Sequence, residues 1–147
     1  MTPLRATHTA RRGITSVALV VIALLLTSCL NPQSAVQSAL NESRRAHNLP
    51  ALRIHQQAQN KAQAWAEQLA RENRLYHSTL SDGITARWCG LAENVGYCAS
   101  VQAVQDAYMR STAHRNNILS KKWNGVGVGY AKRGDRTFTV QVFIRSC

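Results

Sequence analysis

The sequence predicts a single α+β domain, and three observations predict it. Alanine, leucine and tryptophan recur at three- and four-residue spacing over about residues 55–74, as on the buried face of an amphipathic helix. Near the end of the chain, residues 125–130 and 137–145 instead alternate with the period of two that is typical of strands. The chain has 147 residues, which suits one compact domain with a real core and leaves no room for a second.

The first 28 residues have the features of a bacterial secretory signal. Three arginines precede an almost uncharged run over residues 14–26. This run has 13 residues, whereas a bilayer span needs about 20, so we expect cleavage and not a permanent span. It ends in Leu-Thr-Ser-Cys at 26–29, which matches a bacterial lipobox. We therefore expect Cys29 to be lipidated and to become the mature N-terminus; the alternative is an ordinary secreted protein in which Cys29 is a plain thiol.

Lipidation of Cys29 would make the membrane a partner and would place the mature chain at the outer face of the bacterial cell membrane. The full chain has a net charge of +11, and three of its 18 Lys and Arg but none of its 7 Asp and Glu precede Cys29, which leaves +8. A basic exported protein can meet anionic headgroups or acidic wall polymers, whereas export separates it from nucleic acid. The basic residues are scattered along the sequence, so we expect a solvated surface and no basic binding groove.

The mature chain is expected to open with a short tether over residues 29–34 and to continue as one domain over 35–147. Apolar residues from position 36 onward mark a first helix, which ends before Pro50 because proline disfavours helical backbone at the preceding residue. In the helix over about 55–74, Trp65 lies among alanines. We expect it to be a packing anchor and not a ligand-binding aromatic.

The second half alternates between irregular and regular segments. Residues 75–99 show no clear periodicity, and a loop of that length in a compact domain is more often functional than accidental. Helical spacing from Val101 to Tyr108 indicates a third helix, and residues 111–119 indicate a short helix or turn. The strands over 125–130 and 137–145 form a β-hairpin across a Gly-Asp turn, and the glycines of the first strand indicate close packing from a neighbouring element.

Three cysteines follow Cys29, and export to an oxidising compartment favours a disulfide among them. We expect Cys89 to pair with Cys98, because they are close in sequence and flank Glu93. By the loop-entropy estimate a bridge over so short a loop is worth about 2–3 kcal/mol. Cys147 is then free, or it displaces Cys98 as the partner.

Glu93 and His114 are the first candidates for a functional site. Each lies in polar surroundings, just outside an end of the expected third helix. Such positions let a rigid scaffold present side chains to a cleft. His77 lies in the same irregular segment as Glu93, so the fold can bring all three together. The alternative is that Glu93 caps backbone donors and His114 is a structural histidine.

The sequence motifs around these residues resemble those of the bacterial branch of the CAP superfamily. This superfamily includes cysteine-rich secretory proteins, venom allergens and plant pathogenesis-related proteins. The resemblance rests on Leu-Ala-Glu-Asn-Val-Gly at 91–96 and Ser-Thr-Ala-His-Arg-Asn-Asn-Ile-Leu at 111–119. It extends from the first helix, around residues 39–45, to the last strands. It implies a three-layer α-β-α sandwich of the CAP type, whereas periodicity alone implies only α+β.

The family cavity contains two histidines and two acidic residues. Carried over, the first histidine matches His77, the glutamate matches Glu93 and the second histidine matches His114. Ser111 takes the place of the second acid, which argues against a mechanism that needs two carboxylates. Two imidazoles, from His77 and His114, and the carboxylate of Glu93 could bind a divalent metal such as zinc, with open positions for water. In a hydrolase, Glu93 would serve as either general base or metal ligand.

Two functions from different classes follow. The first is a lipid-anchored extracellular module whose cleft, formed by His77, Glu93, Ser111 and His114, binds a lipid, a glycan or a protein. The second is a metal-assisted cell-envelope hydrolase that uses the same residues. The sequence contains no Gly-x-Ser-x-Gly elbow, so a serine hydrolase of that type is excluded.

Overall fold

The computed structural model describes residues 31–147, so the expected signal and the lipidation site at Cys29 lie outside the described residues. Four helices and three strands follow one another along the described chain. Their bounds are α1 Pro32–Ala46, α2 Gln56–Glu72, β1 Trp88–Cys98, α3 Val101–Arg110, α4 Thr112–Leu119, β2 Gly125–Arg133 and β3 Arg136–Ser146. In the described part of the chain, no helix is long and apolar enough to cross a membrane.

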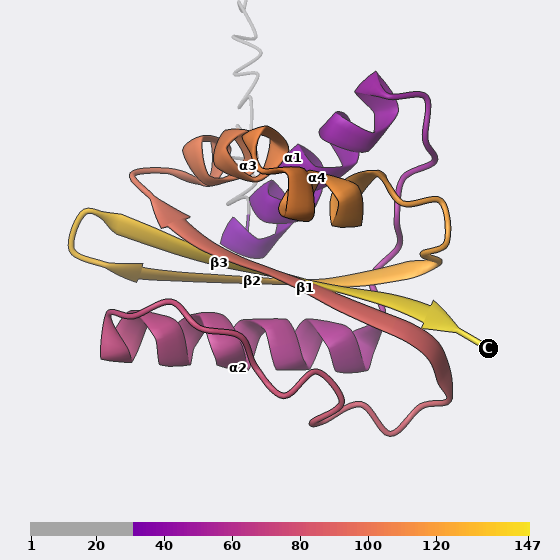
Figure 1. Cartoon of the computed structure of the whole chain (residues 1–147). Coiled ribbons are helices and arrows are strands. Elements are labelled where there is room, and N and C mark those ends of the chain that lie inside the picture. Colours follow the sequence, from indigo (N-terminus) through magenta and orange to yellow (C-terminus); the bar gives the residue numbers. More distant parts are fainter. Residues whose placement is uncertain (1–30) are drawn as a thin grey trace, which may run out of the picture.

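The three strands form one antiparallel sheet in the order β1-β3-β2, so β3 is central and β1 and β2 are the two edges. Figure 1 shows α2 alone beneath the sheet and α1, α3 and α4 above it. Each face of the sheet buries its own apolar cluster, one against the alanines of α2 and one against the three helices above. This arrangement confirms the expected α+β fold, a three-layer α-β-α sandwich.

The helix boundaries follow from local capping. The side chain of Asn31 accepts a hydrogen bond from the backbone N–H of Gln33, and Pro32 occupies the first turn, where its missing N–H costs nothing. Helical structure therefore begins inside the segment expected to be a tether. α2 begins after His55 and ends at Asn73 in the left-handed conformation with φ 53°. These ends agree with the helix expected over about 55–74.

Trp65 is a packing residue, as expected from its place among alanines. It packs against the apolar cluster between α2 and the sheet, and its ring meets that of Tyr76 edge-on at 4.9 Å between centroids. Its indole N–H donates to the carbonyl oxygen of Tyr76 at 3.1 Å. Trp65 thereby fixes the start of the segment that follows α2.

The main difference from the expected elements is β1. Residues 88–98 were expected to belong to a long irregular segment, but they form an 11-residue strand that pairs with β3 along its length. Their apolar and polar residues do not alternate cleanly, because the strand is covered on both faces and polar side chains are buried on each. The pairing partner of Asn94, for example, is Gln141, which lies 47 residues away in the sequence. No local pattern encodes this pairing.

The disulfide expectation is wrong in its pairing: Cys89 is bonded to Cys147 and Cys98 is free. Cys89 and Cys98 lie at opposite ends of β1, and nine residues of strand span about 30 Å. The register instead places Trp88 opposite Ser146. The Cα atoms of Cys89 and Cys147 are consequently 5.2 Å apart, within the range that a disulfide bridges.

The contact between α2 and β2 is unusually close, and glycine makes it possible. A Cβ atom on Gly127 would lie 2.0 Å from the carbonyl carbon of Ala58, and one on Gly129 would lie 2.0 Å from the carbonyl oxygen of Ala62. The small residues of α2 and β2 therefore let a helix backbone rest directly on a strand backbone. This agrees with the close packing expected from the glycines.

A ladder of glutamine side chains seals the outer edge of β2. Gln59 donates to the carbonyl oxygen of Val128 and accepts from its N–H, both at 2.8 Å. One helical turn later, Gln63 does the same for Tyr130, with both distances 3.0 Å. At the start of the strand, the backbone of residues 53–55 pairs with Val126. The N–H and C=O groups of this edge are thus used inside the protein, which blocks pairing with another chain.

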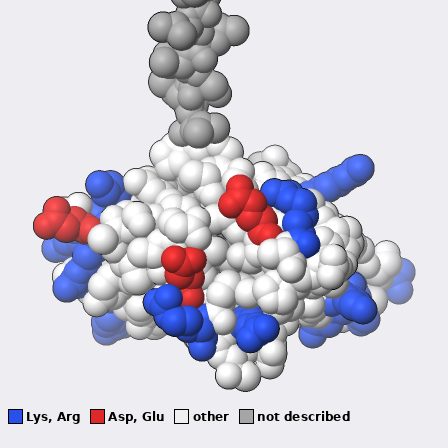
Figure 2. Space-filling model, turned by 90° about the horizontal axis from the view of Figure 1, so that it is seen from above, with Lys and Arg blue, Asp and Glu red and all other residues white. Residues whose placement is uncertain are grey.

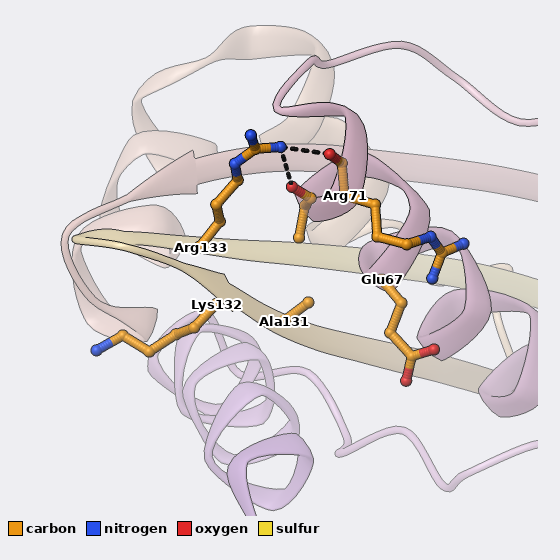
Figure 3. A pocket seen from close by; sticks show the side chains of 6 residues that line it. Glu67, Arg71, Ala131, Lys132 and Arg133 are labelled. Carbon is orange, nitrogen blue, oxygen red and sulfur yellow. Dashed lines mark hydrogen bonds between the residues drawn. The ribbon is translucent and has the colours of Figure 1, made fainter.

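The ladder ends at Glu67, where the next rung would join Lys132. A carboxylate cannot donate to the Lys132 carbonyl oxygen, and Glu67 instead accepts from Gln63 at 2.7 Å. A hollow of about 530 Å³ opens at this point, lined in part by Ala70 and Ala131. Figure 3 shows that Glu67 and Lys132 point away from each other across it, while the Arg133 side chain donates to two carbonyl oxygens at the end of α2.

Candidate functional site

The Glu93 carboxylate is buried at the middle of β1. Its side chain is only 1% exposed and points to the α2 face of the sheet, next to Val142 on β3. Three donors meet it: the His77 ring at 2.8 Å, the Ser78 N–H at 2.9 Å and the Ser78 hydroxyl at 2.6 Å. The segment after α2 supplies all three. A buried carboxylate requires such partners, so Glu93 fixes this segment against the sheet.

His77 is held by one ring nitrogen and presents the other. The Nδ1 atom of His77 lies against Glu93, and a carboxylate can only accept, so Nδ1 carries the proton. The Nε2 atom of the neutral ring is then an acceptor. Because the His77 side chain is 61% exposed, that acceptor is available to a ligand.

His114 reaches the same region from the opposite face of β1. It lies on α4, above the sheet, and its ring packs on that of Tyr108 with 5.0 Å between centroids. Burial lowers the pKa of His114, and the nearby His77 lowers it further. His77 thus lies with Glu93 on the α2 side of β1, and His114 lies on α4 on the other side.

Adjacent residues of β1 position the two histidines. Successive side chains of a strand point to opposite faces, so Glu93 points toward α2 and Asn94 points toward α4. Asn94 donates to the carbonyl oxygen of His114 at 3.2 Å and accepts from Asn117 at 2.9 Å. The Glu-Asn pair thus holds His77 on one face through its ring and His114 on the other through its backbone.

A buried amide network, which the sequence did not predict, supports Asn94. Asn94 donates to Gln141 at 3.0 Å, Gln141 donates to Gln105 at 2.8 Å, and Gln105 donates to the Ser43 hydroxyl at 2.9 Å. Together these bonds join β1, β3, α3 and α1. No local signal marks this network, because Gln141 between Val140 and Val142 fits the alternation expected of a strand with one polar face.

Ser111 lies between the two upper helices. Its N–H donates to the carbonyl oxygens of Ala107 and Tyr108, and its own carbonyl oxygen accepts from Arg115 at 2.8 Å. Ser111 thus ends α3 and begins α4, and α4 carries His114. Among the described residues, no hydrogen bond joins Ser111 to His77 or Glu93.

The metal-ligand chemistry of this region is limited to two imidazoles. Within residues 31–147, no three His, Cys, Asp or Glu residues lie close enough to hold a metal ion together. The Glu93 carboxylate is already used by His77 and Ser78. The side chains of this region that are chemically able to donate to a divalent ion are His77 and His114.

The comparison with protein families decides the classification. The profile of the CAP family, described as the cysteine-rich secretory protein family, matches residues 37–143. The chain belongs to the CAP family. This confirms the resemblance found in the sequence, and the match covers every described element of the fold in whole or in part. A comparison with curated proteins gives no match.

Several solved structures have the same fold. An extracellular protein from Bacillus anthracis that contains an SCP domain is 27% identical, with a TM-score of 0.66 over 78% of this chain and 40% of that one. This chain therefore spans about two fifths of the Bacillus protein. An outer surface protein from Borrelia burgdorferi is 17% identical, with a TM-score of 0.68 over 76% of this chain and 90% of that one. The venom allergen-like protein 4 of Schistosoma mansoni is 14% identical, with a TM-score of 0.64 over 80% and 90%. The last two show the fold alone.

Proposed function

We propose that this CAP domain is a ligand-binding module of the bacterial cell envelope, and that its ligand binds at the edge of β1 between His77 and His114. The observation that carries the proposal is the use of Glu93 inside the protein. Both carboxylate oxygens accept hydrogen bonds from His77 or Ser78. A glutamate held in this way fixes the orientation of the His77 ring, so that its Nε2 atom can accept a hydrogen bond from a ligand. The ligand is a lipid, a glycan or a protein, and Ser111 completes the site only by positioning α4.

The proposed location follows from the N-terminal sequence and from the relatives. The lipobox at 26–29 would attach a lipid to Cys29, three residues before α1 begins at Pro32. The Bacillus relative, at 27% identity, is an extracellular protein, and the Borrelia protein is an outer surface protein. Stable attachment needs more than one acyl chain, which a bacterial lipoprotein supplies.

Zinc binding is part of the proposal in a restricted form. With only His77 and His114 as protein ligands, the affinity would be low, since stable zinc sites use three or four protein ligands. Imidazole must be neutral to bind the ion, and the lowered pKa of His114 keeps that ring neutral to lower pH than usual.

One specific observation favours the second candidate, a cell-envelope hydrolase. A carboxylate that holds the Nδ1 proton of a histidine orients its Nε2 atom to accept a proton from water. His77 would act as the general base, and Glu93 would stabilise the imidazolium that forms. The described residues place no second carboxylate beside this pair.

Turnover assays separate the two functions. Membranes that contain the full chain are incubated with ester, peptide and peptidoglycan substrates, with and without a chelator. The binding module predicts that wild type and His77→Ala give equal rates. Turnover that disappears in His77→Ala or His114→Ala but persists in His47→Ala would refute it, because His47 is an exposed histidine at the end of α1.

The lipid anchor is tested independently of the ligand. Metabolic labelling with a fatty acid should mark the wild-type chain and not Cys29→Ser. If Cys29→Ser were still processed and recovered in the membrane fraction like wild type, the anchor would be wrong.

A further inference from the structure

The two edges of the sheet differ in how their backbone groups are used. On β2, residues Val126, Val128 and Tyr130 point their N–H and C=O groups outward, and all three are bonded within the protein. Backbone groups alternate in direction along a strand, so the odd-numbered residues of β2 bond to β3. The residues of β3 that bond to β2 are therefore even-numbered; Val142 of β3, for example, is the partner of Gly127 of β2.

The same alternation fixes the direction of the groups on β1. The odd-numbered residues of β3 must bond to β1. Their partners on β1 are even-numbered; Asn94 of β1, for example, is the partner of Gln141 of β3. The outward-pointing residues of β1 are therefore the odd-numbered ones: Leu91, Glu93, Val95 and Tyr97. Within the described residues 31–147, no hydrogen bond satisfies the outward N–H or C=O of these four.

The outer end of this edge is more exposed than its middle, where Val95 is 8% exposed. Glu93 as a whole residue is 6% exposed while its side chain is 1% exposed, so its remaining exposure belongs to the backbone. At the end of the strand, Tyr97 is 37% exposed. Figure 1 shows α4 above β1 and the segment after α2 below it. We call the outward edge of β1, at Leu91, Glu93, Val95 and Tyr97, the rail. Eight unpaired backbone groups in one row are the complement of another extended backbone.

The charges around the rail are mainly positive. Arg145 donates to the carbonyl oxygen of Cys89 at one end, and Arg136 lies over the ring of Tyr97 at the other, 4.6 Å from its centroid. The histidines flank the middle of the strand, and the carboxylate of Glu93 there points inward to the α2 face, where His77 and Ser78 donate hydrogen bonds to it. Lys and Arg otherwise lie around the rim of the upper face and form no stripe across it (Figure 2).

We propose that the outward edge of β1 binds an acidic, extended peptide segment of a partner protein as a fourth strand. This inference rests on the proposed ligand-binding function and names the ligand class, a polypeptide. The four outward residues span about 20 Å, the length of a strand of about seven residues. Backbone hydrogen bonds supply the affinity, and carboxylates at the two ends of the peptide meet Arg136 and Arg145.

The probe is a blocked heptapeptide of alternating glutamate and valine, added to the ¹⁵N-labelled full chain in neutral detergent. Hydrogen exchange should slow at least about tenfold at the outward amides of β1, and the amides of Val128 and Tyr130 should not change. The same peptide with alternate backbone nitrogens methylated should give no protection, because it cannot complete the ladder. A peptide in which lysine replaces glutamate should bind several-fold more weakly.

A matched pair of variants tests the rail from the protein side. Tyr97→Pro removes an outward N–H and leaves the bonds to β3 in place, since proline is tolerated on edge strands. Tyr97→Ala removes the ring and keeps the N–H. We expect Tyr97→Pro to bind the peptide at least about threefold more weakly than Tyr97→Ala, with both folded by near-ultraviolet circular dichroism. If Tyr97→Pro does not fold, the comparison of the methylated and unmethylated peptides on the wild-type chain still tests whether the peptide pairs with β1.

Three results would overturn the proposal. The first is equal protection by the methylated and unmethylated peptides, or protection at β2 in place of β1. The second is no protection at millimolar peptide, which would leave a lipid or glycan ligand at the histidines as the proposed function. The third is protection without peptide that rises with protein concentration, which would make a second copy the occupant. Turnover lost in His77→Ala is a separate result that refutes the ligand-binding function itself.

Discussion

Gly127→Ala should be among the most destabilising single-methyl changes in this domain. The new Cβ would lie 2.0 Å from the Ala58 carbonyl carbon, 2.1 Å from its oxygen and 2.2 Å from the Gln59 nitrogen. All three atoms are helix backbone, so no rotamer change relieves the contact. Ordinary contact requires about 3.5 Å, and α2 must therefore move roughly 1.5 Å from the sheet.

The cost follows from that displacement. Overpacking of this kind costs about 1–3 kcal/mol. The same movement stretches the two 2.8 Å hydrogen bonds between Gln59 and Val128 beyond bonding distance, and each contributes about 0.5–1.5 kcal/mol. We expect a loss of about 2–5 kcal/mol, a large fraction of the 5–15 kcal/mol that stabilises a typical domain.

Urea unfolding of the full chain, with the disulfide intact, measures this loss. Gly90→Ala is the matched control, because its Cβ would lie 3.5 Å from the Trp123 ring, an ordinary contact, and Gly90 does not have a positive φ. We expect it to change the free energy of unfolding by less than about 0.5 kcal/mol. Equal effects of Gly127→Ala and Gly90→Ala would show that α2 does not rest on β2 as described.

Three further predictions concern other parts of the molecule. Peptide mapping without reduction should find Cys89 joined to Cys147, and Cys147→Ser should lower the free energy of unfolding by up to about 4 kcal/mol, the loop-entropy value for this separation; a peptide joining Cys89 to Cys98 would contradict the fold. Glu67→Gln should extend the glutamine ladder to Lys132 and stabilise the domain by about 1 kcal/mol in urea unfolding, and a loss of stability would count against the ladder. Because the pKa of His114 is lowered, folding favours its neutral form: its contribution is complete above its unfolded pKa of about 6.5 and is lost as pH falls through the folded value. His114→Gln should therefore show a smaller decrease in the free energy of unfolding between pH 7.5 and 4.5 than wild type, and parallel pH profiles would contradict this.

The sequence by itself determined the elements whose signal is local. The alanine stripe of α2 and the alternation of β2 and β3 are periodic over a few residues, and each period follows from backbone geometry. The same stripe explains why Trp65 packs inward. The sequence motifs around Glu93 and His114 also indicated the CAP family, although no short-range rule places those two residues in one region of the fold.

Only the tertiary structure decided what depends on pairing between distant segments. β1 has no clean alternation, because it is covered on both faces, and only its register with β3 makes it a strand. That register places Cys89 beside Cys147 and separates Cys89 from Cys98 by the length of the strand. It also turns Glu93 and Asn94 to opposite faces, where each holds one histidine. The physical reason is that side-chain direction in a strand reverses at every residue, so a site built across a strand exists only once its register is fixed.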